Sequence, residues 1–167
     1  EIVWANNSQE RKAAATEMGW IGEVNIGQKK KKKYQDSSYL IGFGTNTGTV
    51  AAATNWDGDM EVKELLPARK DSYEYLFHNI GIPSFFLPLK QELKKSAYQL
   101  LLPEKLERAV GVIYRPDTEY KSHYFSAILP KQFDEYIWFD KTHAITPLLP
   151  KHLNHLEELP ETYPFGF

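Results

Sequence analysis

Cysteine is absent from all 167 residues, which excludes a disulfide framework and any cysteine-based metal site. A chain without cysteine is compatible with a reducing compartment, and we expect a cytoplasmic protein. No apolar run approaches the roughly 20 residues that span a bilayer. The net charge is only −2, so the chain has no general attraction to nucleic acids or to anionic membranes. We therefore expect neither nucleic acid nor membrane as a partner.

What the chain does contain is typical of a globular domain. Hydrophobic residues make up 42% of the sequence and aromatic residues 14%, enough to build a core from large side chains. The length suits one domain, which we place at residues 1–149, followed by a tail at 150–167 that is rich in proline. Glu1 stands directly before an apparent strand, so we expect the natural protein to have sequence upstream.

Short apolar runs separated by helical segments predict an α/β fold, a mainly parallel sheet flanked by helices. Because these runs are apolar throughout, we expect strands that are covered on both faces. A helix is predicted over 73–79, with Asp71-Ser72 offering its N-cap and Gly81 as its stop, and another over 20–33. The principal strands are predicted at residues 3–4, 40–43, 85–87, 110–114 and 137–139, with further strands at 49–54 and 60–66.

Polar side chains follow the first predicted strand at once. Asn6, Asn7, Ser8 and Gln9 come directly after the apolar residues 2–4, and a segment able to form a helix follows them. Ligands of open α/β sheets bind outside the carboxyl ends of the strands. The sequence therefore places a candidate site here.

The same segment resembles the erythromycin esterase family. Family members have Trp-Ala-His-Asn-Ser-His followed by Thr-Glu-Met-Gly, and this chain matches that register without a gap. Asn6 and Gln9 stand where the family has its two histidines, and Ala14 takes the place of an arginine. The likeness continues in order to about residue 149, through the segments 22–28, 40–45, 47–52, 111–116, 122–125 and 132–140.

The resemblance implies a hydrolase that opens the lactone ester of macrolide antibiotics, or of other esters in related members. Water would be the attacking group and a histidine its general base, with no cofactor and no metal. The partner would be a small-molecule ester. By this resemblance the catalytic positions are Asn6, Gln9 and Glu17, and the substrate-binding ones Trp4 and Thr45.

Amides cannot accept a proton at neutral pH, so we expect impaired catalysis. A further histidine and glutamates of the family lie in an upstream half that is not part of this sequence. The alternatives are a pseudoenzyme that binds ligand without turnover and a decayed gene product. Glu17 could equally be a carboxylate near a helix cap or an acid of the site.

The other motifs are better explained by ordinary structural roles than by ligand binding. The five lysines at 29–33 are better explained as a solvated helix end than as a nucleic-acid patch. The glycine- and threonine-rich segment 42–49 lacks the lysine of a phosphate-binding loop and predicts a tight turn, although Thr45 could still face a cleft. Asp57 and Asp59 begin a calcium-like spacing that is not completed.

The histidines outside the motif are also better explained as surface or structural residues than as parts of a site. His152 and His155 share a possible helical face with Glu158, for which surface decoration is the better interpretation. His78 is predicted to be structural, on an apolar helix face. Ser122 and His123 are neighbours along what we expect to be a strand, so they point in opposite directions and form no catalytic pair.

Overall fold

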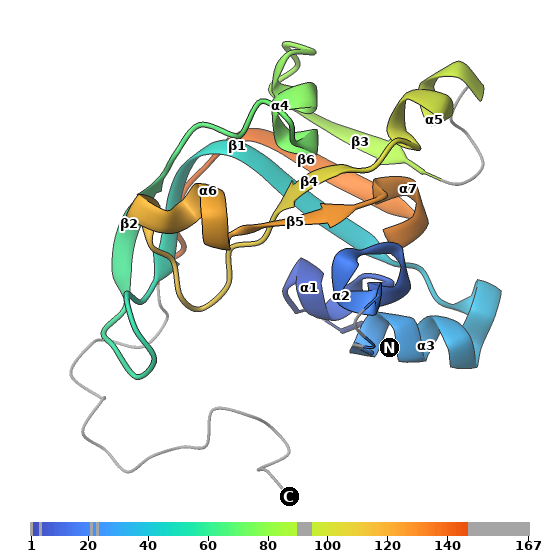
Figure 1. Cartoon of the computed structure of the whole chain (residues 1–167), viewed down its shortest axis with the longest axis horizontal. Coiled ribbons are helices and arrows are strands. Elements are labelled where there is room, and N and C mark those ends of the chain that lie inside the picture. The colour runs from blue at the N-terminus through green and yellow to red at the C-terminus, as the bar shows by residue number, and fades with distance from the viewer. Residues whose placement is uncertain (1, 4, 21, 23, 90–94, 147–167) are drawn as a thin grey trace, which may run out of the picture.

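The computed structural model describes residues 2–3, 5–20, 22, 24–89 and 95–146. This part of the chain forms a four-stranded sheet in the order β2-β1-β6-β3, together with a two-stranded ribbon, β4-β5 (Figure 1). The strands are β1 (Ile41–Ala52), β2 (Glu61–Leu65), β3 (Ser84–Pro88), β4 (Lys105–Arg108), β5 (Tyr124–Ala127) and β6 (Glu135–Thr142).

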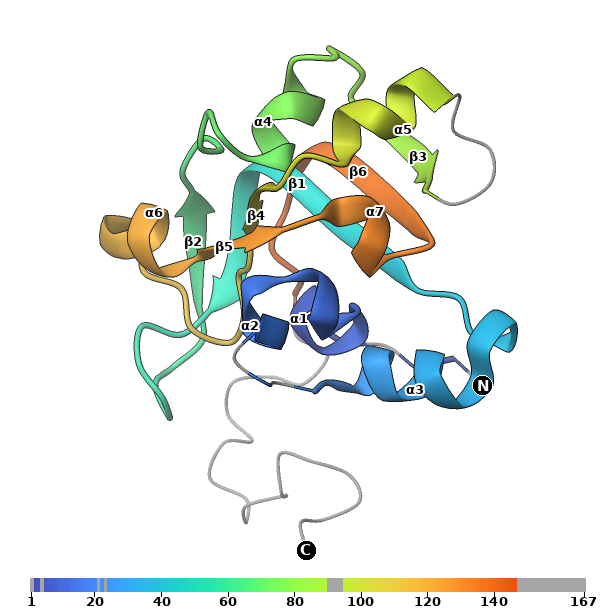
Figure 2. The same ribbon diagram turned by 45° about the vertical axis from the view of Figure 1, so that its right-hand side comes forward.

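Helices lie around the sheet. The group α1, α2 and α3 sits together next to the N-terminal half of β1, whereas α4 packs over β1, β6 and β4, and α5 lies beside α7 (Figure 1 and Figure 2). Within the described residues, none of these helices has the length and apolar character needed to cross a membrane. The helices are α1 (Asn7–Glu10), α2 (Glu17–Trp20), α3 (Ile26–Tyr34), α4 (Tyr73–His78), α5 (Lys95–Leu101), α6 (Glu119–Ser122) and α7 (Leu129–Gln132), with short 3-10 turns at Ala13–Ala15, Gln35–Ser37 and Pro116–Thr118.

The main core fills the space between one face of the sheet and the helices. Tyr136 and Trp138 of β6 are fully buried there, and they pack against Phe77 of α4. The rings of Phe77 and Trp138 lie 5.5 Å apart between centroids in an edge-on arrangement, which is a favourable aromatic geometry. We call this side of the sheet the inner face.

Gly42 of β1 leaves room for this core. A Cβ at position 42 would stand 2.8 Å from carbon atoms of the rings of Phe133 and Tyr136. Glycine is therefore needed at this point of the strand because two aromatic rings approach the backbone closely, and no phosphate is required to explain it.

We expect Gly42→Ala to lower the free energy of unfolding by about 1–3 kcal/mol, because the added methyl overpacks a fixed aromatic core. Gly111→Ala is the matched control, since a Cβ at position 111 meets nothing within 4 Å. Urea denaturation of both variants measures the difference. Equal stability of the two variants would contradict the packing argument.

The predicted helix over 73–79 is confirmed as α4. The Ser72 hydroxyl accepts a hydrogen bond from the Tyr75 backbone N–H, which satisfies one of the free donors of the first turn. Gly81 follows the helix with φ +74, a left-handed conformation that glycine adopts without strain. The predicted strands at 60–66, 85–87 and 137–139 are also present, as β2, β3 and β6.

The prediction of a mainly parallel sheet is wrong. β1 and β6 are parallel, but β1 pairs with β2 and β3 pairs with β6 in antiparallel fashion. The expected strand at residues 3–4 is not formed at Val3, and Trp4 lies outside the described residues. Residues 110–114 form no regular strand either, and only Ile113 makes a bridge there, to Ala53.

The predicted turn at 42–49 is also wrong, because β1 runs through it without interruption. Gly48 pairs with Thr142 on one side and with Leu65 on the other, so neighbours on both edges hold the segment extended. The predicted strands at 40–43 and 49–54 are therefore two ends of one bent strand. The predicted helix over 20–33 is shorter than expected, since α3 begins at Ile26.

Candidate functional site

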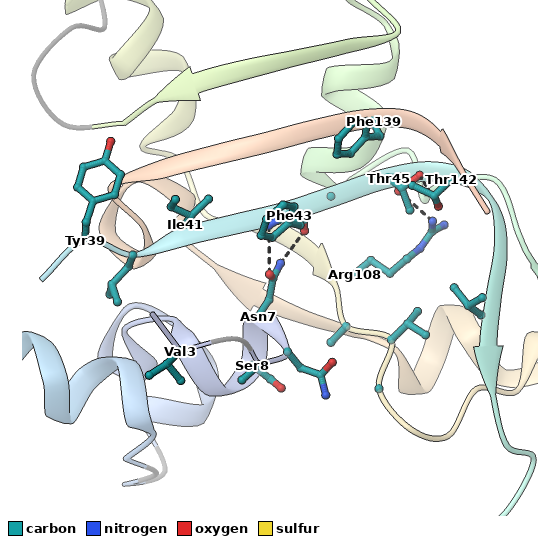
Figure 3. A pocket seen from close by; sticks show the side chains of 18 of the residues that line it. Val3, Asn7, Ser8, Tyr39, Ile41, Phe43, Thr45, Arg108, Phe139 and Thr142 are labelled. Atoms are coloured by element: carbon teal, nitrogen blue, oxygen red, sulfur yellow. Dashed lines mark hydrogen bonds between the residues drawn. The ribbon is translucent and has the colours of Figure 1, made fainter. Parts of the chain in front are cut away.

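A cavity of about 1340 Å³ lies between the N-terminal segment and β1 (Figure 3). Its wall is mostly apolar, with side chains such as Val3, Ile41, Phe43 and Phe139. The polar residues that line it include Asn6, Asn7, Ser8, Thr45, Thr142 and Arg108. A large apolar cavity with a few polar groups is the usual form of a small-molecule site.

Asn7 attaches the N-terminal segment to the sheet. Its side-chain Nδ2 donates a hydrogen bond to the Phe43 carbonyl at 2.6 Å, and the Phe43 N–H donates to its Oδ1 at 3.1 Å (Figure 3). One amide thus satisfies both backbone groups of a β1 residue, as a neighbouring strand would. This pair of bonds fixes α1 over one end of the cavity.

The structure brings two of the predicted site residues to the cavity. Asn6 is exposed just before α1 and lines the cavity, and so does Thr45 of β1. The Thr45 hydroxyl donates to the Thr47 carbonyl at 3.0 Å and accepts from the Thr142 hydroxyl at 3.2 Å.

The other predicted site residues lie elsewhere. Gln9 is exposed on α1 and Glu17 is half-buried at the start of α2, and neither is among the described residues that line the cavity. Trp4 falls outside the described residues. The catalytic and binding roles assigned to these positions stay predictions.

Motif residues that match the family and those that differ from it have different surroundings. Asn7 holds β1, and the buried Thr16 bonds through its hydroxyl to the Ala13 carbonyl at 2.8 Å. Positions 6, 9 and 14, where the family's histidines and arginine are missing, are all exposed. The positions that the resemblance associates with ionisable groups therefore lie on the surface of the segment, whereas Asn7 and Thr16 hold its backbone in place.

Arg108 is a buried cation that was not among the candidate site residues predicted from the sequence. Its guanidinium donates to the carbonyls of Thr45 at 3.1 Å, Asn46 at 2.9 Å and Leu66 at 2.7 Å, and Nε donates to the Tyr124 hydroxyl at 2.9 Å. Nε also lies 2.8 Å from Oε1 of Glu119, whose side chain has no exposed area. Arg108 thus joins the bend of β1 to the end of β2.

Two buried glutamates lie next to Arg108, Glu107 in the sequence and Glu74 through a hydrogen bond. Glu74, which lines the cavity, accepts a hydrogen bond from the Arg108 backbone N–H at 3.0 Å, and burial raises the pKa of its carboxyl. Burial also raises the pKa of Glu107 to about 8, against the opposing effects of a hydrogen bond from Gln132 and the charge of Arg11. A carboxyl with such a pKa can hold a proton at neutral pH.

We expect Glu107 to make stability depend on pH. Because its pKa is raised in the folded state, its contribution is complete below about pH 4.5 and is lost as the pH rises through about 8. Unfolding free energy should therefore fall by about 2–3 kcal/mol between pH 6 and pH 9 in the natural protein, and much less in Glu107→Gln. Denaturation at both pH values measures this.

The control for that experiment is Glu64→Gln, which removes an exposed carboxyl from β2. This substitution should leave the decrease in the free energy of unfolding between pH 6 and pH 9 unchanged. Parallel pH profiles of Glu107→Gln and the natural protein would show that Glu107 does not hold the proton.

The remaining motifs form no second site within the described residues. No group of three or more His, Asp or Glu side chains there could hold a metal ion. In the lysine run, Lys31 pairs with Asp134 at 3.3 Å and bonds to the Ser38 carbonyl at 2.7 Å, and the last three lysines lie in the final turn of α3. His152, His155 and Glu158 lie outside the described residues.

His78 and His123 differ from their predicted settings. His78 is exposed at the end of α4, with Nδ1 2.7 Å from Oδ1 of Asp140, because the helix ends there and turns the ring toward β6 rather than into the core. His123 follows α6 instead of lying in a strand, and its Nε2 accepts the Arg115 N–H at 3.3 Å.

Comparison with known proteins identifies a matching family and solved structures of similar fold. A family model described as erythromycin esterase matches residues 1–142. A solved structure of a Bacillus cereus protein is 22% identical with a TM-score of 0.70, and the match covers 85% of this chain and 33% of that one. A structure described as a succinoglycan biosynthesis protein is 22% identical with a TM-score of 0.67, covering 84% and 33%. At this identity the likeness concerns the fold, and this chain spans about a third of the length of both proteins.

Proposed function

Because the chain belongs to the erythromycin esterase family, we propose that its cavity binds a small-molecule carboxylic ester, such as a macrolide lactone, and hydrolyses it poorly. The observation that carries this proposal is the cavity between the motif segment and β1. Its volume of about 1340 Å³ exceeds the roughly 300–1,000 Å³ of most small-molecule pockets, which suits a bulky substrate.

The lining supports an ester that is largely apolar. Phe43, Phe139 and Ile41 offer apolar contact, while Asn6 and Ser8 offer hydrogen bonds to carbonyl or hydroxyl oxygens. The Thr45 hydroxyl donates its proton to the Thr47 carbonyl, so toward a ligand it can only accept. An ester needs no charged partner for binding, and this wall supplies neutral donors. The lining therefore offers the contacts that binding such an ester requires.

The motif segment lacks a general base for the chemical step of hydrolysis. Hydrolysis needs a group that removes a proton from water as the oxygen attacks the carbonyl carbon. Asn6 and Gln9 have amides, which can donate and accept hydrogen bonds but cannot take that proton. A positioned base contributes about 10²–10⁴-fold in rate, and this share is missing on the motif segment.

A ligand-binding protein without turnover is the second candidate. The observation that favours it is the difference between the retained and the lost motif positions. Asn7 and Thr16 still fix the segment through hydrogen bonds, whereas the exposed positions 6, 9 and 14 have lost their ionisable groups. Such a pattern suits a pocket that is maintained for binding alone.

Two measurements on the purified protein test these proposals. Mass spectrometry of a macrolide incubated with it detects ring opening as the gain of one water, and titration calorimetry measures binding. We expect saturable binding with ring opening close to background. Efficient ring opening would contradict impaired hydrolysis, and absence of binding would contradict both candidates.

A further inference from the structure

Glu74 has a carboxylate oxygen without a partner at the wall of the cavity. The residue lies in the first turn of α4, lines the cavity and is only 1% exposed. One oxygen, Oε1, accepts the Arg108 backbone N–H at 3.0 Å, whereas Oε2 has no hydrogen-bond partner within the described residues. A buried carboxylate oxygen without a donor destabilises the protein, so Oε2 requires a donor that the described residues do not supply.

Two more buried oxygens near Glu74 are in the same situation. Oε1 of Glu107 and the hydroxyl of Tyr136, on the inner face, have no hydrogen-bond partner within that part of the chain. Burial, followed by the charges of Glu107 and Glu74, raises the pKa of Tyr136, so the three side chains are neighbours. Gly44, which lines the cavity, lies against the Tyr136 hydroxyl, because a Cβ at position 44 would collide with it. The three oxygens therefore lie close together without forming hydrogen bonds to one another.

The buried charges around Glu74 do not balance. Apart from Asp134, which pairs with Lys31, the buried charged residues that the structure describes are Arg11, Glu74, Glu107, Arg108 and Glu119. Arg108 pairs with Glu119 at 2.8 Å, and its guanidinium points to carbonyls of the bend of β1 (Figure 3). The charge of Arg11 acts on Glu107. Three carboxylates thus share two guanidinium groups, which leaves one negative charge in excess.

A proton or a cation can relieve this excess. Burial raises the pKa of Glu74, so the glutamates retain a proton more readily while no cation is bound. Water can donate hydrogen bonds to these oxygens but brings no charge. The described residues contain no group of three His, Asp or Glu side chains that could hold a metal ion, and the cavity wall is mostly apolar. An organic ammonium group supplies both the donor and the charge.

We propose that the cavity takes an ester that carries a protonated amine, with the amine N–H donating to Oε2 of Glu74. The apolar part of the same ligand then contacts Phe43 and Phe139. A hydrogen bond between charged groups is stronger in a site shielded from water than at the surface. The inference rests on the proposed function, because it adds a charged group to the same ligand.

Two esters of the same shape test this preference for charge. Dimethylaminoethyl phenylacetate has a tertiary amine that is protonated at pH 7, and isopentyl phenylacetate has a CH group in place of that nitrogen. Titration calorimetry measures the affinity of the natural protein for each ester. We expect the amine ester to bind at least about tenfold more tightly, because only its ammonium pairs with Glu74. The preference should persist at about 0.5 M sodium chloride, which screens exposed charges much more than a buried pair.

The variant Glu74→Gln removes the charge and keeps the shape of the side chain. Its affinities for the two esters should agree within about twofold, with the isopentyl ester bound as before. The control Glu64→Gln removes an exposed carboxyl from β2 and should keep the full preference. Circular dichroism checks that both variants fold, and the comparison of the two esters in the natural protein does not depend on them.

The outcomes separate this inference from the proposed function. Equal affinity of the natural protein for the two esters would overturn the inference and leave the proposed function in place. A preference that disappears in salt, or one that Glu74→Gln retains, would also overturn it, since other charges would then attract the amine. Binding of neither ester would overturn the proposed function and the inference with it.

Discussion

Arg108→Met should lower the free energy of unfolding by about 3–5 kcal/mol, a large share of the stability of a domain of this size. The Arg108 side chain is 4% exposed and its partner Glu119 is fully buried. Removing the guanidinium strands a carboxylate in the interior and leaves the carbonyls of Thr45, Asn46 and Leu66 without their donor. Buried groups without partners contribute about 1–3 kcal/mol each to such a loss.

Urea denaturation followed by circular dichroism measures the effect. The control is Arg69→Met, because Arg69 is half-buried, with the exposed Asp71 as its carboxylate partner at 2.8 Å, so its loss leaves no buried carboxylate unpaired and should cost less than that of Arg108. The double variant Arg108→Met with Glu119→Gln should lose less than Arg108→Met alone, since no charge is then left unpaired. A loss below about 1 kcal/mol in Arg108→Met would contradict its role in joining β1 to β2.

Elements whose signals are local could be predicted from the sequence. The helix α4 has its cap at Ser72 and its stop at Gly81 within ten residues of each other, and both act in the structure as expected. β3 and the centre of β6, residues 136–139, are apolar runs that mark these strands, although β6 continues to Thr142. In these segments the residues that decide the structure are neighbours in the chain.

β1 could not be predicted because its partners are distant in the sequence. Residues 44–49 contain glycine, threonine and asparagine, which favour turns when nothing else acts on them. In the structure Asn46 is buried, its side chain accepts the Ala68 N–H at 3.1 Å, and Arg108 donates to its carbonyl. These contacts, from residues more than 20 positions away, satisfy polar groups that would otherwise favour a loop.

The residues that line the cavity could be predicted only in part, for the same reason. Asn6 could be placed at the cavity because it directly follows a segment that the family likeness identifies. Glu107 and Arg108 were missed, since charged residues are usually exposed and nothing adjacent in the sequence indicates that these two are buried. An apolar residue on each side, Leu106 and Ala109, is the one local sign that they face the interior.

Histidines at positions 6 and 9 should restore hydrolysis only in a larger assembly. Asn6→His with Gln9→His supplies the missing base, but this chain spans about a third of the solved relatives, and the family's remaining ionisable groups are expected outside it. We therefore expect the double variant alone to open macrolide rings at the background rate. Joined in one chain to the upstream half of a family member, it should exceed the same fusion without the two substitutions by about 10²–10⁴-fold.

The pH dependence of that gain separates catalysis from a general effect on folding. A histidine base must be neutral, so the added rate should rise with pH through about 6.5. Lys12→His is the matched control, because it puts an imidazole on the same segment where the family has none. Binding and oxyanion stabilisation alone can leave a trace of activity, so a small rate in every variant is expected. Efficient turnover by the unsubstituted 167-residue chain would show that another group, such as Glu17 or His123, is the base.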